Sequence, residues 1–291
     1  MKAKTADLLL LVVAILWGFG YIGTDLLIAQ NMNTLAIVGY LFLISTIFLI
    51  FIFYKKLKIK KYYLCVYIVV VIILFLAFFF QTVAMNYTTV TNVSFFTGIN
   101  VIFIPLLAFI FNKKALKINH LLAVLLTICG IYFLTGGINN LVLGDILALI
   151  CAFLFALHIV LIAYYAKKIE IFNLAIYQML VVAILAFIFA IPLQINMLEQ
   201  VLKVNGLILL FVGLVPSAIC FLCQNIALKY TDEARGSIIL NTEALWGALF
   251  AIILLGEIFK VSIIIGGLLM FSAVLLDEIN FKKKFKNIKN N

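Results

Sequence analysis

The chain has 291 residues, of which 67% are hydrophobic and 11% are charged, and its mean hydropathy is +1.29. An ordinary soluble domain is only about half apolar, so this composition excludes that class and indicates a membrane protein with many spanning segments. The net charge of +10 suits attraction to anionic lipid headgroups, and we expect no nucleic-acid binding because the apolar segments leave no room for a soluble domain.

Ten apolar stretches follow one another along the chain, and each is close to the roughly 20 residues with which an α-helix crosses a bilayer. They cover residues 6–28, 33–54, 62–84, 90–111, 119–136, 143–165, 172–193, 205–228, 235–255 and 261–279. The first is longer than the core of a signal peptide and lacks a small-residue cleavage site, so we expect it to remain as a helix.

The positive charges are distributed unevenly between the two sides that these stretches define. Of the 21 Lys and Arg residues, 19 fall on the termini and on every second connection, which leaves only Lys203 and Lys260 on the other side. Short cytoplasmic loops retain Lys and Arg. The pattern therefore predicts a multi-pass membrane protein with both termini in the cytoplasm, and the location that we expect is a bacterial inner membrane.

The chain also resembles itself at an offset of 143 residues. Gln81, Ala84, Tyr87 and Thr88 correspond to Gln224, Ala227, Tyr230 and Thr231, and with a shorter offset of 138 upstream, Asp7 corresponds to Asp145. Each copy holds five helices, so consecutive copies enter the membrane in opposite orientations. The predicted fold is an all-α membrane protein of ten transmembrane helices in two inverted five-helix repeats, residues 1–138 and 139–280, followed by a basic cytoplasmic tail, 281–291. Inverted repeats are typical of secondary transporters, whose site lies near the midplane between the halves.

Several segments resemble the drug/metabolite transporter superfamily with its EamA-type domain. They are Ala14-Ile-Leu-Trp-Gly-Phe-Gly-Tyr21, Gly144-Asp-Ile-Leu-Ala-Leu-Ile-Cys-Ala-Phe-Leu-Phe-Ala156, Gln224-Asn-Ile-Ala-Leu-Lys-Tyr-Thr231, Asn241-Thr-Glu-Ala-Leu-Trp-Gly-Ala-Leu-Phe-Ala251 and Leu255-Gly-Glu257. The resemblance covers nearly the whole chain and implies a ten-helix bacterial metabolite exporter. Two departures are that Lys113-Lys114 replaces the first repeat's terminal Gly-Glu and that Ala244 stands where the family usually has Pro. We interpret the remaining Gly-Glu as a helix-end packing device.

Glu243 is the leading candidate for the solute site. It lies near the middle of the ninth stretch, its counterpart at offset 143 is Asn100, and a carboxyl group at that depth is costly. It is interpreted either as a carboxylate that binds the solute or a proton, or as a structural group hydrogen-bonded to Asn241 or Asn100.

Other polar and aromatic residues within the stretches are further candidates for substrate binding. His158 is able to bind solute or shuttle protons, or to donate one hydrogen bond between helices. Trp17 and Tyr21 share a face, as do Glu243 and Trp246, so both tryptophans are either an aromatic wall around a ligand or core packing. The amides of Gln81, Gln178 and Gln224 suit either helix contacts or recognition of a zwitterionic solute.

The favoured function is a secondary membrane transporter that exports a small organic metabolite by alternating access. The solute would be amino acid-like, an amine or another neutral, zwitterionic or cationic compound, because no Lys or Arg lies deep in a stretch to bind a phosphate. The alternative is an intramembrane enzyme or flippase acting on a lipid headgroup, which would need clustered catalytic groups. We expect no enzymatic activity, cofactor or metal. The expected partners are the solute, the lipid bilayer and protons as a coupling ion, and the expected state is a monomer or weak homodimer.

Overall fold

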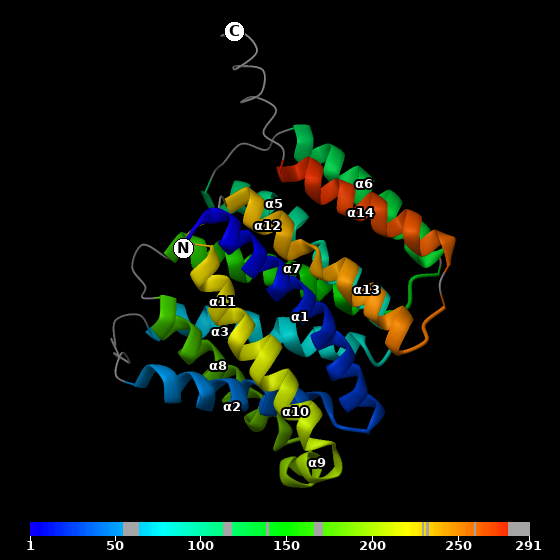
Figure 1. Ribbon diagram of the computed structural model, residues 1–291. Helices are drawn as coiled ribbons and strands as arrows, with labels where there is room; N and C mark the ends of the chain where they lie inside the picture. The colour runs from blue at the N-terminus through cyan, green and yellow to red at the C-terminus, as the bar shows by residue number, and fades with distance from the viewer. Residues whose placement is uncertain are drawn as a thin grey trace.

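The computed structural model describes residues 1–54, 64–112, 118–137, 140–165, 171–228, 230, 233–258 and 260–278, and in these residues it contains helices and no strand. Figure 1 shows the helices packed side by side in one bundle. Their bounds are α1 (Ala3–Ala29), α2 (Thr34–Phe53), α3 (Leu64–Ala84), α4 (Val90–Gly98), α5 (Asn100–Asn112), α6 (Ile118–Thr135), α7 (Leu143–Tyr165), α8 (Ile171–Ala190), α9 (Met197–Lys203), α10 (Gly206–Val212), the π-helix Gly213–Ile219, α11 (Cys220–Ala227), α12 (Glu233–Asn241), α13 (Glu243–Leu254) and α14 (Val261–Glu278).

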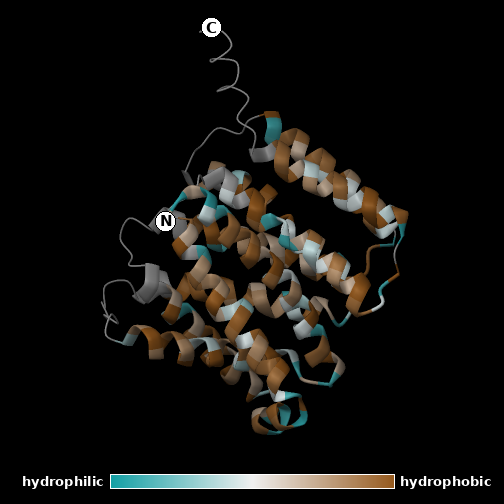
Figure 2. Cartoon of the chain, in the orientation of Figure 1, coloured by the Kyte–Doolittle hydropathy of each residue, from teal (hydrophilic) through white to brown (hydrophobic). Residues whose placement is uncertain are grey.

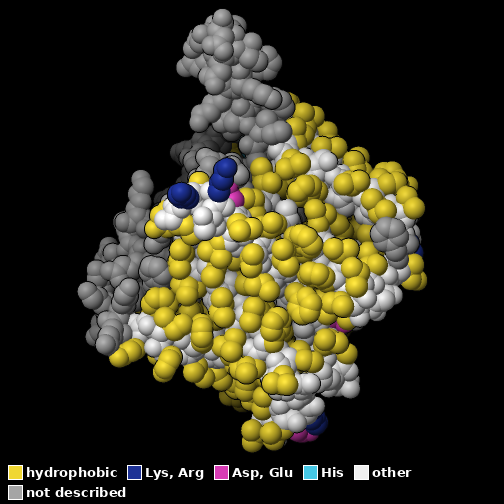
Figure 3. Space-filling view, viewed as in Figure 1, with side chains coloured by type: hydrophobic (Ala, Val, Ile, Leu, Met, Phe, Trp, Pro, Cys, Tyr) yellow, Lys and Arg dark blue, Asp and Glu magenta, His cyan; other side chains and the backbone are white. Residues whose placement is uncertain are grey.

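The helices have the length and surface of membrane spans. Within the described residues, six are long and apolar enough to cross a bilayer: Ala3–Ala29, Thr34–Phe53, Val90–Phe111, Ile118–Thr135, Leu143–Leu161 and Gly206–Gln224. Four shorter apolar helices accompany them: Ile68–Ala84, Ala175–Ala190, Ile238–Leu254 and Val261–Leu276. The helices are mostly hydrophobic along their length in Figure 2, and the face seen in Figure 3 is covered by hydrophobic side chains. Such a surface is stable against lipid and not against water.

Two of the predicted stretches are interrupted helices. Residues 90–111, expected as a single helix, form α4 and α5 with Ile99 between them, and residues 235–255 form α12 and α13 with Thr242 between them. The two interrupting residues have nearly the same backbone conformation, φ −66° and ψ −11° at Ile99 and φ −62° and ψ −11° at Thr242. Each forms one tighter turn of i to i+3 bonds. The interruptions lie 143 residues apart, which is the offset of the sequence repeat.

The eighth stretch is also irregular. Residues 205–228 form one predicted stretch, and the middle of the segment is the π-helix, with Pro216 inside it. Proline has no N–H group and its ring displaces the preceding turn. Two hydroxyl groups compensate for the altered carbonyl bonding, since the Ser217 Oγ donates to the Val212 carbonyl at 2.9 Å and the Ser45 Oγ to the Gly213 carbonyl at 2.8 Å.

The connection before this segment contains a short helix that the sequence analysis did not predict. Helix α8 ends at Ala190, and α9 then begins at Met197, preceded by Asn196, whose side chain accepts the Glu199 N–H group at 3.2 Å. Asn is among the preferred residues at the start of a helix because its oxygen satisfies a free N–H group. In Figure 1, α9 lies at one end of the bundle.

Helices that occupy corresponding places in the two halves pack against each other. This holds for α2 with α8 and for α6 with α14, while α4 packs against α13, which belongs to the corresponding stretch of the second half. The pair α6 and α14 runs side by side along one edge of Figure 1. Small residues permit the close approach: a Cβ atom on Gly130 would lie 2.4 Å from Met270 Cγ, and one on Gly266 would lie 2.8 Å from the Gly130 carbonyl oxygen. The core therefore lies between the two halves of the chain.

Candidate functional site

The two interrupted helices cross at the centre of the fold. At the crossing, the Asn241 Nδ2 donates to the carbonyl of Gly98 at 3.1 Å, and this bond joins two residues 143 positions apart. Gly98 permits this close approach, since a Cβ atom there would lie 3.2 Å from both Ala244 Cβ and Asn241 Oδ1. The Ser94 Oγ lies 3.2 Å from the Ala244 carbonyl and adds a second tie. The last turn of α4 is thus bonded to the point where α12 passes into α13.

Glu243 is the first residue of α13, directly beside this crossing, and its side chain is partly buried. Among the residues that the structure describes, its carboxyl group accepts no hydrogen bond. Asn241, one of its two expected structural partners, bonds to Gly98 instead. Asn100, the other, begins α5 and likewise makes no side-chain hydrogen bond within the described residues. The geometry therefore leaves this carboxyl group without a bond that would tie it to another helix.

Glu243 belongs to a group of polar residues that are linked to one another and come from five helices. The Gln81 Nε2 of α3 donates to the Tyr21 hydroxyl of α1 at 3.2 Å. Tyr21 and the fully buried Cys151 of α7 both lie within electrostatic range of Glu243. Thr97 of α4 lies beside these two residues, and its buried Oγ1 makes no hydrogen bond of standard geometry. We call these five residues the central cluster.

Two members of the central cluster were not among the predicted site residues. Thr97 stands out in the sequence as a hydroxyl residue within an apolar stretch, which was a usable signal. Cys151 has no such signal, because a lone cysteine in a membrane helix resembles any small packing residue. Its place beside Glu243 follows only from the packing of α7 near α4.

The two predicted tryptophans make different contacts. The Trp17 Nε1 donates to the carbonyl of Pro216 at 2.9 Å, and its ring lies 5.4 Å from that of Phe221. Trp246 stacks on Phe250 with ring centroids 6.1 Å apart, and its Cβ atom packs where Gly18 leaves space. The indole N–H of Trp17 is thus engaged with the π-helix in this conformation.

His158 and Gln178 form a separate buried pair that joins α7 to α8. The Nε2 atoms of the two side chains lie 2.9 Å apart, and each residue is 8% exposed. With the amide nitrogen as donor, the imidazole Nε2 accepts and the neutral ring carries its proton on Nδ1. Gln224 of α11, a further predicted residue, is partly buried and makes no side-chain hydrogen bond within the described chain.

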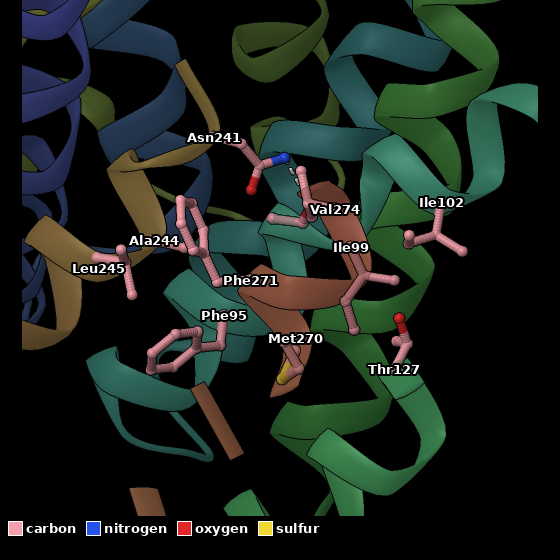
Figure 4. Close-up of a pocket in the computed structure, with 11 residues that line it drawn as sticks. Phe95, Ile99, Ile102, Thr127, Asn241, Ala244, Leu245, Met270, Phe271 and Val274 are labelled. Atoms are coloured by element: carbon pink, nitrogen blue, oxygen red, sulfur yellow. Dashed lines mark hydrogen bonds between the residues drawn. The ribbon is translucent and has the colours of Figure 1, made fainter. Parts of the chain in front are cut away.

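The crossing holds only a small cavity of about 10 Å³, shown in Figure 4. It lies between α4, α13, α6 and α14, with Asn241 and Thr127 as its polar lining. A volume of this size has room for about one water molecule and none for an organic solute. A larger groove of about 560 Å³ lies against α8 and α9, and none of the predicted site residues lines it.

The chemistry of the central cluster is that of a binding site for a hydrogen-bond donor. It combines one carboxyl group, two hydroxyl groups, a thiol and an amide, and it contains no Lys or Arg. No group of three or more His, Cys, Asp or Glu residues that could hold a metal ion occurs in the described ranges.

Comparisons with known proteins agree with this architecture. The family described as EamA-like transporter family matches the chain twice, over residues 4–136 and 142–276. An "uncharacterized transporter" of Archaeoglobus fulgidus is 29% identical over 278 residues, covering 95% of this chain and 86% of the relative. An "uncharacterized transporter" of Methanothermobacter thermautotrophicus is 25% identical over 286 residues, covering 89% and 82%. A solved structure, described only as the crystal structure of a protein, has the same fold, with a TM-score of 0.68, 16% identity and coverage of 95% of this chain and 96% of the other.

Proposed function

The chain belongs to the EamA-like transporter family, as its sequence motifs indicated, and we propose that it carries a small organic solute by alternating access between its two repeats. The family and the relatives identify a multi-pass membrane transporter. The solute, the direction of transport and the mechanism are the parts that we propose.

One observation carries the proposal: a carboxyl group that accepts no hydrogen bond from the described residues lies where two interrupted helices cross. Interrupted helices near the midplane build the substrate sites of many secondary transporters. An ionisable residue inside a membrane protein is costly, by roughly 3 kcal/mol on insertion scales, and is retained for function more often than for packing. Glu243 meets both conditions, since it begins α13 and is not bonded to any described residue.

The central cluster favours a solute that donates hydrogen bonds or carries positive charge. A primary or quaternary ammonium group would neutralise Glu243, and the hydroxyls of Tyr21 and Thr97 and the amide of Gln81 would contact the rest of the solute. Phosphorylated solutes are disfavoured because Arg and Lys are the usual phosphate ligands and the cluster has neither. The substrate class that we propose is therefore amines, amino acid-like compounds and related cations.

The proposed arrangement in the membrane follows from the charge distribution. All ten apolar segments cross the bilayer as two inverted repeats, residues 1–138 and 139–280, with both termini in the cytoplasm and the protein in the plasma membrane. The two relatives compared are archaeal, so a bacterial source stays a prediction from the sequence. Transport is outward and uses protons as the coupling ion, and the carrier works as a monomer or weak homodimer.

Transport by purified protein in liposomes tests the proposal. Counterflow of radiolabelled amines, amino acids and quaternary ammonium compounds should be saturable for at least one class and should return the solute chemically unchanged. Conversion of a lipid headgroup in the same liposomes, without solute movement, would instead establish the enzymatic alternative. Empty liposomes and protein denatured before reconstitution are the controls for leakage.

A further inference from the structure

Glu257 joins the end of the second repeat to the beginning of α4. Its two carboxylate oxygens accept the backbone N–H groups of Val90 at 2.7 Å and Thr91 at 3.2 Å. Gly256, at φ +70°, ends α13, and the Glu257 N–H returns to the Ala251 carbonyl at 3.3 Å. A glycine with positive φ is typical of the residue that follows a helix end, and this turn sets the direction in which Glu257 leaves the helix.

The physical character of this contact makes it stronger than an ordinary surface hydrogen bond. The first N–H groups of a helix have no partner within the helix, and the helix dipole places partial positive charge there. A carboxylate that accepts two of them makes charge-assisted bonds, roughly twice as strong as neutral ones. Asp25 of α1 lies within electrostatic range of Glu257. Both side chains are acidic, so Asp25 does not help to hold Glu257 in place.

A second carboxylate holds the same segment from another helix. Asp145, in the first turn of α7 and 1% exposed, accepts the Thr88 hydroxyl at 2.6 Å and the Asn92 amide at 2.9 Å. Residues 88–92 therefore lie between two acidic residues of the second repeat, one on α7 and one after α13.

The two carboxylates differ in whether the sequence repeats them. Asp145 corresponds to Asp7, so this acidic position exists in both halves, whereas Glu257 corresponds to Lys114. Lys114 lies outside the described residues. A lysine side chain has no carboxylate, so it cannot accept backbone N–H groups as Glu257 does. The contact made by Glu257 is therefore a feature of one repeat and of one face of the protein.

We propose that Glu257 is a latch that keeps the solute pathway closed at the face where α4 begins, and that release of this latch opens that face. The inference rests on the proposed transport function. Opening this face requires the N-terminal turn of α4 to separate from the end of α13, and that movement breaks both Glu257 bonds. Because Glu257 has no acidic counterpart, the latch biases the resting carrier toward closure at this face. Under the proposed topology this face is extracellular, so the resting carrier loads solute from the cytoplasm.

The native Cys151 offers a direct readout of opening. It belongs to the central cluster and is 0% exposed in the closed conformation. Cys65, Cys129, Cys220 and Cys223 are replaced by Ser, and the rate at which a membrane-impermeant maleimide modifies Cys151 is measured in right-side-out and inside-out vesicles. A separate Lys260→Cys variant, at an exposed position near the latch, shows in which vesicles the latched face meets the reagent.

Two variants break the latch from opposite sides. Glu257→Gln removes the charge of the acceptor, and Val90→Pro removes the donor of the shorter bond. Proline is tolerated at the first position of a helix, and the preceding Thr89, at φ −72° and ψ 153°, has the extended conformation that proline requires of its neighbour. Glu199→Gln is the matched control, because Glu199 is exposed and pairs only with Lys203 within α9.

We expect both latch variants to speed modification of Cys151 about tenfold or more from the latched face, since tenfold corresponds to about 1.4 kcal/mol, with no change in the control. Rates that stay within twofold of the parent in both variants would overturn the latch. Labelling does not depend on solute, so accelerated labelling without any solute transport would leave the latch standing and refute the proposed function. Normal transport with unchanged labelling would refute the latch and leave the proposed function standing.

Discussion

Replacement of Glu243 by Gln separates a binding role from a structural role. Gln has nearly the same shape as Glu and removes only the ionisable group. The carboxyl of Glu243 accepts no hydrogen bond from the described residues, so the substitution breaks no contact between helices. Ionisable side chains at mid-membrane cost roughly 3 kcal/mol on insertion scales. We therefore expect the variant to be as stable as the parent or more stable.

The effect expected on transport is larger than the effect on stability, and it is a loss rather than a gain. A hydrogen bond to a charged group contributes about 1.5–3 kcal/mol, and 1.4 kcal/mol corresponds to a factor of ten. Loss of the bond between Glu243 and a cationic solute should therefore weaken the apparent affinity by about ten- to a hundredfold. Counterflow in liposomes measures the affinity, and thermal unfolding in detergent measures the stability.

Asn241→Ala is the control for a structural role. It removes the bond to the Gly98 carbonyl, and hydrogen bonds between membrane helices contribute about 0.6 kcal/mol on average and up to about 1.7 kcal/mol. We expect a lower unfolding temperature for this variant. If Glu243→Gln instead lowers the unfolding temperature as much as Asn241→Ala does and transports at the parent rate, then Glu243 is a packing residue and the reasoning from its unpaired carboxyl is wrong.

Three other predictions address helix contacts and topology. Trp17→Phe keeps the ring contact but loses the bond to the Pro216 carbonyl, so unfolding should become easier by about 1 kcal/mol; an unchanged thermal midpoint would show that the bond contributes nothing. Gly18→Val should disrupt packing, because even the first added carbon would lie 2.6 Å from Trp246 Cβ, and overpacking costs about 1–3 kcal/mol or more; expression of a monodisperse, fully stable variant would contradict the close approach of α1 to α13. Cysteines introduced at Lys58 and at Glu257 should be labelled from the cytoplasm and from outside, respectively, and labelling of both from one side would refute the ten-helix topology.

Much of the local structure was predictable because membrane helices depend on the composition of short segments. The predicted stretch 33–54 corresponds to the helix Thr34–Phe53, and 143–165 to Leu143–Tyr165. In lipid, every backbone polar group must be satisfied within its own segment, so a long apolar run has no stable alternative to a helix. The offset of 143 residues was likewise visible in the sequence, and the interruptions at Ile99 and Thr242 keep that offset.

The interruptions themselves were not predictable, because neither Ile99 nor Thr242 is a residue that ends helices by its own conformation. Proline marks only one of the irregular helices, because the π-helix contains Pro216 whereas α5 continues through Pro105. A membrane helix tolerates proline where neighbouring groups satisfy the freed carbonyls, and such groups are contributed by other helices.

The sequence by itself determined the class of protein, the approximate helix bounds, the repeat and the family, because hydropathy and motifs are properties of contiguous residues. The tertiary structure decided which polar groups meet. It assigned the Asn241 amide to Gly98, left Glu243 without a hydrogen bond to any residue that the structure describes, paired Gln178 with His158 and brought Glu257 to the first amides of α4. These pairings depend on how helices distant in sequence cross and rotate about their axes, which no single segment of the chain specifies.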